Sequence, residues 1–173
     1  MGVDYQFPWD RLITAFKFSG QVELARVLAP LLLPSIQSHL DPDAEPLPAL
    51  DWICPVPLWH GRLAERGYNQ SWELARRLAA DLGCPASADL LQRWRATATQ
   101  SKLDREARLQ NMRGAFMVPP HRAGSIAGRH IALVDDVMTT GSTAFEAAQT
   151  LLQNGAASVQ LWVLARVELP SPA

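Results

Sequence analysis

The segment 131–143, IALVDDVMTTGST, constrains the fold of this chain more than any other segment. Its first four residues are aliphatic and indicate a strand that is buried on both faces. Two acidic residues follow at the carboxyl end of that strand, and the apolar-periodic run 144–152 indicates a helix after the turn. Open α/β sheets bind their ligands at the carboxyl ends of strands, so the segment predicts both an α/β fold and the place of a site.

The turn between the expected strand and the expected helix is rich in hydroxyl groups. A helix N-terminus with a flexible glycine and exposed N–H groups is suited to binding an anion. A plain N-cap would explain one or two Ser or Thr residues, but five capping-type residues in a row exceed what one cap requires. We therefore expect a phosphate group to bind to Thr139, Thr140, Gly141, Ser142 and Thr143.

The adjacent carboxylates of Asp135 and Asp136 repel each other, which favours a functional role for the pair. Side chains alternate along a strand, so each carboxylate can accept a hydrogen bond from a different sugar hydroxyl. Their charge can also stabilise an oxocarbenium-like sugar during displacement at its anomeric carbon. With the phosphate turn they describe a ribose 5-phosphate pocket in which the two acids are candidate catalytic residues. The alternative is that Asp136 caps a turn and Asp135 is solvated.

Two other nucleotide-binding classes share part of this pattern. A hydrophobic strand that ends in two acids is also typical of a Walker B element, but the chain has no GxxxxGK[ST] segment to accompany it. It has no GxGxxG segment either, which disfavours a dinucleotide-binding fold.

The composition limits the size and the environment of the protein. With 173 residues, 48% of them hydrophobic, the chain has enough apolar material for one ordinary domain. A net charge of -1 argues against direct nucleic-acid binding. The start of the chain has no apolar leader, and the most apolar run, 27–36, is interrupted by two prolines, so we expect a cytoplasmic protein without a membrane span. The scattered cysteines and histidines predict no metal site made of protein side chains.

Strand and helix patterns alternate along most of the chain. This alternation predicts a mostly parallel central sheet with flanking helices. We expect an N-terminal helical extension at 1–50 and an α/β core at 51–173. The expected helices lie at 11–18, 21–36, 71–82 and 144–152, and the expected strands at 51–56, 115–118, 131–134 and 158–165.

The segment 131–143 resembles the phosphoribosyl pyrophosphate (PRPP) motif of type I phosphoribosyltransferases. Three further segments resemble the ComF family, whose members are phosphoribosyltransferase-like proteins associated with DNA uptake in naturally competent bacteria. They are LITAFKFSG, PVPLWHGRLAERGYNQSWELARRLA and TATQSKLDREARLQNMRGAF. Many ComF-like proteins begin with a cysteine-rich zinc-binding segment that this sequence does not contain, so we expect either a shortened chain or a member without that segment.

The resemblance implies a type I phosphoribosyltransferase-like fold in which residues 1–50 form a hood. It also implies binding of PRPP with Mg²⁺ and transfer of the phosphoribosyl group to a nitrogenous base with release of pyrophosphate. We expect a phosphoribosyltransferase with a link to competence and DNA uptake. The alternative is a non-catalytic phosphoribosyl or nucleotide sensor, or an assembly factor in DNA uptake. A partner in the uptake machinery and a homodimer both stay open.

Basic residues near the expected site suggest how pyrophosphate would be bound. Arg62 and Arg66 follow the first core strand and are expected at the same sheet edge as the acidic pair, although both could lie on a solvated helix face. A basic loop is expected to close over the site and exclude water. The alternative is that these basic residues belong to an exposed surface on which they form salt bridges with neighbouring acids. The candidate residues of this loop are Arg95, Lys102, Arg105 and Arg108.

Two further expectations concern the segments on either side of this basic region. Type I enzymes often carry an unusual cis peptide bond in the pyrophosphate loop, so the resemblance implies backbone strain at 57–59. Trp59 and Trp94 lie in segments expected near the pocket, and either could stack on a base, although most tryptophans are core or interface anchors.

Overall fold

The structure is a computed structural model that describes residues 2–37, 48–96 and 112–167. At its centre is a parallel sheet with the strand order β1-β6-β5-β2. The expectation of a mostly parallel sheet with flanking helices is therefore confirmed. Its strands are β1 (Val3–Asp4), β2 (Trp52–Pro55), β5 (His130–Met138) and β6 (Ser158–Arg166).

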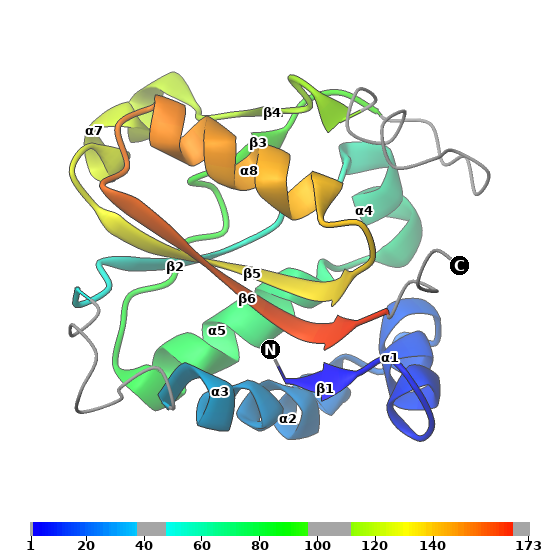
Figure 1. Ribbon diagram of the computed structural model, residues 1–173. Helices are drawn as coiled ribbons and strands as arrows, with labels where there is room; N and C mark the ends of the chain where they lie inside the picture. Colours follow the sequence, from blue (N-terminus) through cyan, green and yellow to red (C-terminus); the bar gives the residue numbers. More distant parts are fainter. Residues whose placement is uncertain (1, 38–47, 97–111, 168–173) are drawn as a thin grey trace, which may run out of the picture.

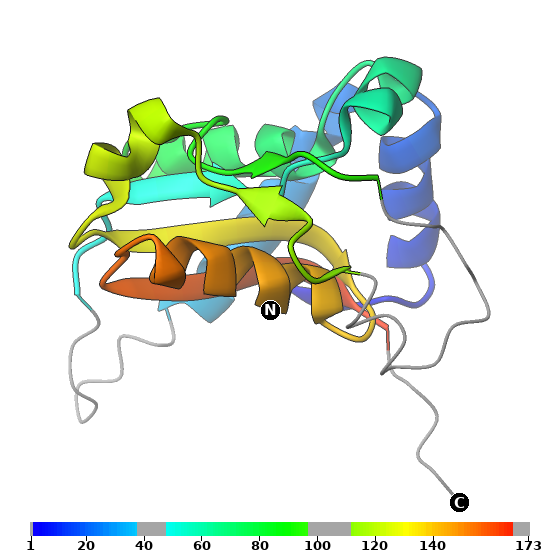
Figure 2. The ribbon, with the colours of Figure 1, turned by 90° about the horizontal axis from the view of Figure 1, so that it is seen from above.

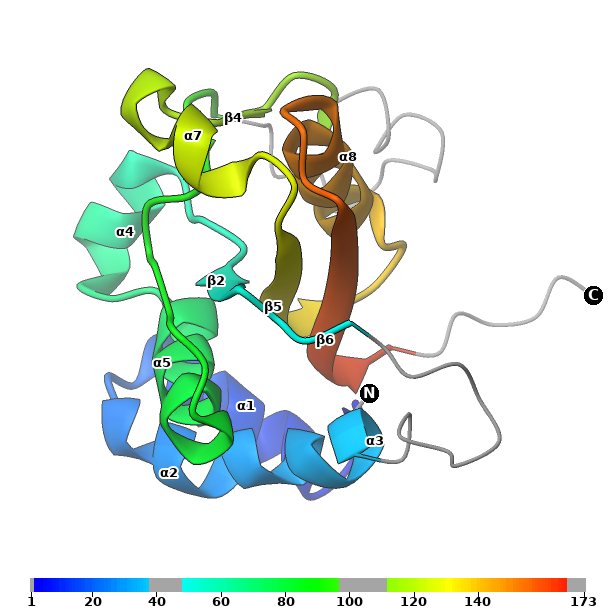
Figure 3. The ribbon, with the colours of Figure 1, turned by 90° about the vertical axis from the view of Figure 1, so that its left-hand side faces the viewer.

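Helices cover both faces of this sheet (Figures 1 and 3). Alternate side chains of β5 face opposite layers, as the continuous aliphatic run requires. Ala132 and Val134 pack in a core with α5 (Gln70–Leu82), whereas Ile131 and Leu133 pack in a second core with α8 (Ser142–Gln153). The first core also includes side chains of α1 (Trp9–Phe18), α2 (Ala25–Leu28) and the 3₁₀ helix Ala29–Leu32.

The N-terminal region differs from its expectation in two ways. The helical run expected at 21–36 is present at 22–37, but it is not one regular α-helix. It consists of the 3₁₀ helices Val22–Leu24 and Ala29–Leu32, with α2 between them and α3 (Leu33–Gln37) after them. Pro30 and Pro34 each lack the N–H that a continuous helix needs. In addition, β1 pairs with the end of β6, and no sequence pattern had indicated this strand.

A second, smaller sheet lies on the α8 side, as the view from above shows (Figure 2). Its strands β3 (Gln92–Arg93) and β4 (Phe116–Met117) are antiparallel. The 3₁₀ helix Pro120–Arg122 and α7 (Ala123–Ile126) then lead into β5, and α4 (His60–Arg66) connects β2 to α5. In the described part of the chain, no helix has the length and apolar character needed to cross a membrane.

The carboxyl edge of the main sheet is stepped. β2 ends at Pro55, where its register partner is Val134, and the Val56 N–H donates a last hydrogen bond of 2.8 Å to the Val134 oxygen. β5 continues to Met138 along β6, so the acidic pair lies in the carboxyl-terminal half of the strand, which extends beyond the aliphatic run 131–134. β2 ends early, because Pro55 and Pro57 have no N–H to donate to a neighbouring strand, and this leaves Asp135 and Asp136 beyond the last pairing with β2.

Candidate functional site

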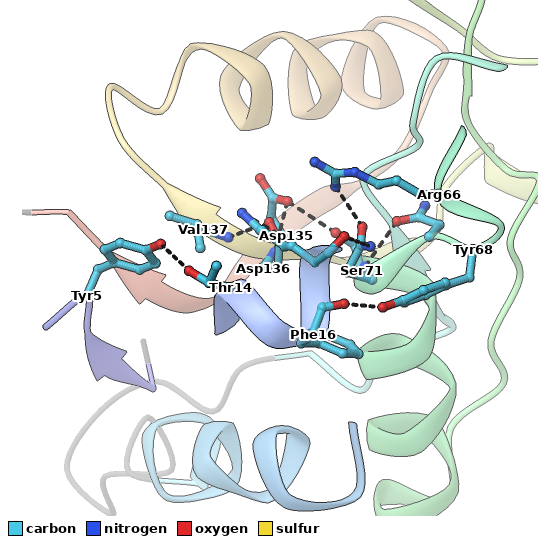
Figure 4. A network of polar contacts seen from close by, with 12 residues as sticks. Tyr5, Thr14, Phe16, Arg66, Tyr68, Ser71, Asp135, Asp136 and Val137 are labelled. Carbon is cyan, nitrogen blue, oxygen red and sulfur yellow. Dashed lines mark hydrogen bonds and ion pairs between the residues drawn. The ribbon is translucent and has the colours of Figure 1, made fainter. Parts of the chain in front are cut away.

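The two acids lie at the step of the sheet and turn toward different partners (Figure 4). Asp135 Oδ1 accepts hydrogen bonds from the Ser71 hydroxyl at 3.2 Å and from the Asp136 N–H at 2.9 Å. Asp136 Oδ1 accepts a bond of 2.6 Å from the Val137 N–H. Asp136 is buried, with 8% of its surface exposed. The expectation that alternation gives each carboxylate its own surroundings agrees with this geometry.

A lysine from the other end of the chain forms an ion pair with this site. Lys17, in the last turn of α1, places its Nζ 3.2 Å from Asp136 Oδ2. The sequence analysis assigned no role to Lys17, although it lies in the LITAFKFSG segment that carries part of the family resemblance. That resemblance was the only sequence feature that could have identified Lys17, because the local pattern of α1 does not indicate a contact with β5.

The electrostatics of the acidic pair follow from burial. Burial and, to a lesser extent, the neighbouring Asp136 charge raise the pKa of the Asp135 carboxyl to about 7, although the hydrogen bond from the Asp136 N–H, the Lys17 ammonium and the Ser71 hydroxyl oppose this shift. A carboxyl with such a pKa changes charge near neutral pH, as is common at functional sites.

The segment after β2 brings basic side chains to the same edge. The Arg66 guanidinium donates a 3.0 Å hydrogen bond to Gln70 Oε1 and lies 4.9 Å from the centre of the Phe18 ring. Burial lowers its pKa, as does the charge of nearby Arg62, whereas Asp136 raises it. Arg62, Arg66 and Lys17 line one cavity of about 410 Å³. The expected position of both arginines near the acidic pair agrees with this arrangement, and their role with pyrophosphate stays a prediction.

The turn between α4 and α5 is shaped by two residues. Gly67 ends α4 in the left-handed region, with φ 80°, where residues with a Cβ are strained. Asn69 then caps α5, because its Oδ1 accepts the Ser71 N–H at 3.0 Å, and its Nδ2 donates to the Val56 oxygen at 3.1 Å. These bonds fix the start of α5, and with it Ser71, against the end of β2.

The hydroxyl-rich turn lies directly after the acidic strand and leads into α8. Gly141 has φ 78°, and α8 starts at the next residue, so unpaired N–H groups of its first turn lie at this point. Thr140 Oγ1 and Ser142 Oγ are 2.8 Å apart, and Thr140, Gly141 and Ser142 line a cavity of about 550 Å³. Thr139 and Thr143 flank them in sequence. The turn thus has the helix start that was expected, and phosphate binding there stays a prediction.

The expected closing loop is only partly described. Lys102, Arg105 and Arg108 lie outside the described residues. Arg95 is exposed, and its guanidinium donates a hydrogen bond of 2.5 Å to the main-chain oxygen of Arg113. The strain expected at 57–59 is wrong, because the cis peptide bond among the described residues is Phe7–Pro8 and no non-glycine residue there has a positive φ.

A third cavity, of about 720 Å³, lies on the other side of α4. Trp59, Trp72 and Trp94 line it together with Arg93 from β3. Trp94 is 56% exposed, so its ring is accessible to a planar ligand. The two tryptophans singled out from the sequence therefore share one cavity, and stacking of a base on them stays a prediction.

The protein ligands for a metal ion are few in the described ranges. Residues 2–37, 48–96 and 112–167 contain no cluster of three or more His, Cys, Asp or Glu side chains suited to holding an ion. The acidic pair offers carboxylate oxygens, which Mg²⁺ accepts, and that ion retains several waters in most protein sites.

Comparison with known proteins shows the class of protein to which this fold and its candidate site belong. Residues 69–168, which include α5, the acidic pair and the hydroxyl-rich turn, match the model of the phosphoribosyl transferase domain. A crystal structure of adenine phosphoribosyltransferase aligns with a TM-score of 0.50 and 17% identity, over 84% of this chain and 71% of that chain, which shows the shared fold.

Curated relatives narrow the class further. The chain is 44% identical to the DNA utilization protein YhgH of Salmonella typhi, over 94% of this chain and 69% of that protein. It is 38% identical to competence protein F of Haemophilus influenzae, with the same coverages, and 32% identical to competence protein ComFC of Bacillus subtilis, over 89% of this chain and 58% of that protein. The chain belongs to the ComF family of phosphoribosyltransferase-like proteins.

Proposed function

We propose that the protein binds PRPP with Mg²⁺ and transfers its phosphoribosyl group to a nitrogenous base. The observation that carries this proposal is the sequence of groups along one strand and turn: Asp135 and Asp136 at the carboxyl edge of the sheet, followed directly by the turn that opens α8. The carboxylates for the ribose hydroxyls and the helix start for the 5-phosphate thus follow one another along the chain, which suits the binding of one sugar phosphate.

In the proposed reaction a nitrogen lone pair of the base attacks the anomeric carbon of PRPP. The bond from that carbon to the pyrophosphate oxygen breaks, and its electron pair leaves with pyrophosphate, while the proton of the attacking nitrogen passes to water. Asp135 and Asp136 accept hydrogen bonds from the ribose hydroxyls, and their charge stabilises the cationic sugar. Arg62 and Arg66, which line one cavity with Lys17, would supply positive charge to the leaving group.

The Mg²⁺ ion would neutralise the charge of pyrophosphate as it leaves. The acidic pair could supply carboxylate oxygens to it, and substrate oxygens and waters would complete its shell. The ion and the ribose hydroxyls would then share the same two carboxylates, one of which is paired with Lys17 in the ligand-free structure.

Replacement of both acids tests this proposal. Asp135→Asn with Asp136→Asn preserves size and removes the charge, and charge-assisted hydrogen bonds contribute about 1.5–3 kcal/mol each, so PRPP affinity should fall at least about tenfold. The change is measured by calorimetry with Mg²⁺, beside the melting temperature. The matched control is Asp81→Asn, which removes an exposed carboxylate near the end of α5, away from the edge. Unchanged PRPP affinity in a folded double variant would reject the proposal.

A second candidate is a non-catalytic phosphoribosyl or nucleotide sensor, or an assembly factor, in DNA uptake. It is favoured by the names of the relatives, which refer to competence and DNA utilization. Both candidates bind PRPP, but only the transferase releases pyrophosphate from it when a base is present. Pyrophosphate release across a panel of bases therefore separates them.

Both cysteines are free thiols, which is typical of a reducing compartment, and we propose a cytoplasmic location.

A further inference from the structure

The last turn of α1 is held against the start of α5 by three contacts. The Tyr68 hydroxyl donates to the main-chain oxygen of Phe16. Gln70 Nε2 donates to the main-chain oxygen of Lys17 at 3.4 Å, and the Arg66 guanidinium lies over the ring of Phe18. Three successive residues of α1 are thus fixed to the segment that carries the basic side chains, and Figure 4 shows the first of these contacts, between Tyr68 and Phe16.

This docking gathers positive charge on one side of the acidic pair. Lys17, Arg62 and Arg66 line the cavity of about 410 Å³, with Glu65 as the acid beside them. The Lys17 side chain is 18% exposed, so its ammonium lies at the wall of the cavity rather than in bulk water. Like charges held close together in a partly buried place repel each other, and a bound anion would relieve that repulsion.

We propose that Lys17 is a further pyrophosphate-binding residue, supplied by the N-terminal helix, which pairs with Asp136 in the ligand-free protein and turns to the pyrophosphate group when PRPP binds. The inference rests on the proposed function and extends it to a residue outside the matched domain. When ribose hydroxyls donate to Asp136, the carboxylate no longer needs its lysine. A pyrophosphate group carries more negative charge than one carboxylate and attracts the ammonium more strongly.

The residue type supports such an exchange of partners. Arginine is the usual basic residue of this chain, because lysine occurs only at positions 17 and 102 among 16 basic residues. Arginine forms a rigid fork suited to one bidentate partner, whereas lysine is a point charge on a flexible stem. A lysine at position 17 can move between the two anions without breaking a fixed planar geometry.

The test measures the binding of metal-free pyrophosphate and of ribose 5-phosphate separately by calorimetry, so that the metal-binding role proposed for the acids does not enter. Lys17→Met keeps the length of the stem and removes the charge, and we expect its affinity for pyrophosphate to fall at least about tenfold. Its affinity for ribose 5-phosphate, which lacks the pyrophosphate group, should fall much less. Lys17→Arg should retain most of the pyrophosphate affinity. Arg11→Met is the matched control, since it removes one exposed charge from the same helix and should behave as the wild type.

A double-mutant cycle separates a direct contact between Lys17 and pyrophosphate from a structural role of Lys17. It also keeps the test valid if Lys17→Met alone misfolds. Asp136→Asn removes the carboxylate that holds Lys17, so pyrophosphate affinity should rise. Lys17→Met with Asp136→Asn leaves no buried charge unpaired and should fold, but the rise should be lost. An equal rise in both backgrounds would overturn the inference, because additive effects would show that the rise comes from removing the Asp136 charge and not from releasing Lys17.

The outcomes also separate this inference from the proposed function. If the wild type binds PRPP and Lys17→Met binds pyrophosphate as tightly as the wild type, only the inference fails. If pyrophosphate binding depends on Lys17 while neither ribose 5-phosphate nor PRPP binds, the anion site stands and the transferase proposal fails. If the wild type binds no pyrophosphate, the inference fails whatever the other ligands do.

Discussion

At the scale of single residues, the surroundings of Asp135 set the charge of its carboxyl. The unfolded chain would release this proton near pH 3.8, whereas the folded protein retains it to about pH 7. Between these values the folded state binds more protons than the unfolded state, so the free energy of unfolding falls as the pH rises. The carboxylate that would bind a ribose hydroxyl is therefore formed at a cost to stability, as is common for functional residues.

The first prediction concerns this pH dependence. We expect the stability of the wild type relative to Asp135→Asn to fall by on the order of 1 kcal/mol per pH unit on the way up to neutral pH, and to level off above it. Asparagine does not titrate, so the difference isolates Asp135. The measurement is urea unfolding of both proteins across this range. A constant difference between them would show that burial does not perturb this carboxyl.

At the scale of elements, α5 is positioned by its first residues. Asn69 joins two elements, because one atom of its amide caps α5 and the other bonds to the main chain beyond β2. The cap determines where Ser71 meets Asp135, and the helix that follows packs against β2 and β5 in the first core.

The second prediction follows from these two bonds. Asn69→Ala removes both of them and should lower the free energy of unfolding by about 1–2 kcal/mol. Asn69→Asp keeps the acceptor for the Ser71 N–H and loses only the donor to Val56, so its stability should lie between those of the wild type and the alanine variant. Urea unfolding measures the three proteins. Equal stability of the alanine and aspartate variants would show that the cap contributes nothing.

The third prediction concerns the docking of α1. Tyr68→Phe removes the hydroxyl that bonds to Phe16, leaves that carbonyl without its donor, and should cost about 1 kcal/mol. Hydrogen exchange of the α1 amides should become faster, because the last turn is held less firmly. Tyr5→Phe is the matched control: its hydroxyl bonds to the exposed Thr14 side chain at 3.4 Å, and the change should cost little. If α1 exchanges at the same rate in both variants, the Tyr68 bond does not hold it.

At the scale of the whole molecule, the N-terminal region and the α/β core share one hydrophobic cluster. Ile13, Phe16, Leu28 and Leu32 are fully buried in the core that also contains Leu74 and Val134. Burial of a large apolar side chain contributes about 1.5–3 kcal/mol, so these four contribute about 6–12 kcal/mol. That is comparable to the whole stability of a typical domain, about 5–15 kcal/mol.

The fourth prediction is that residues 51–173 do not form a stable unit alone. Without residues 1–50, the apolar side chains of α5 and of the sheet that pack against the N-terminal helices would be exposed to water. In addition, β6 would lose its partner β1. We expect the fragment to unfold without a cooperative transition, measured by circular dichroism on heating and in urea. A fragment with a sharp transition near that of the full chain would show that residues 1–50 are a separate addition.

Much of the architecture could be predicted from local patterns. The aliphatic run before Asp135, the prolines that end β2 and the capping residues before α8 report burial and backbone preference over a few residues. At 21–36 the aliphatic spacing indicated the helical run but not its 3₁₀ stretches, one of which contains Pro30. The local patterns also missed β1, because two residues are too few to show a period.

By itself, the sequence determined the α/β class, the parallel sheet, and the strand and turn that form the candidate sugar phosphate site. Only the tertiary structure decided which distant groups meet there: Ser71 at Asp135, Lys17 at Asp136, and Lys17, Arg62 and Arg66 around one cavity. The physical reason is that periodicity and turn chemistry depend on neighbours along the chain. The distance between α1 and β5 depends on how the layers pack, and no pattern within either element encodes it.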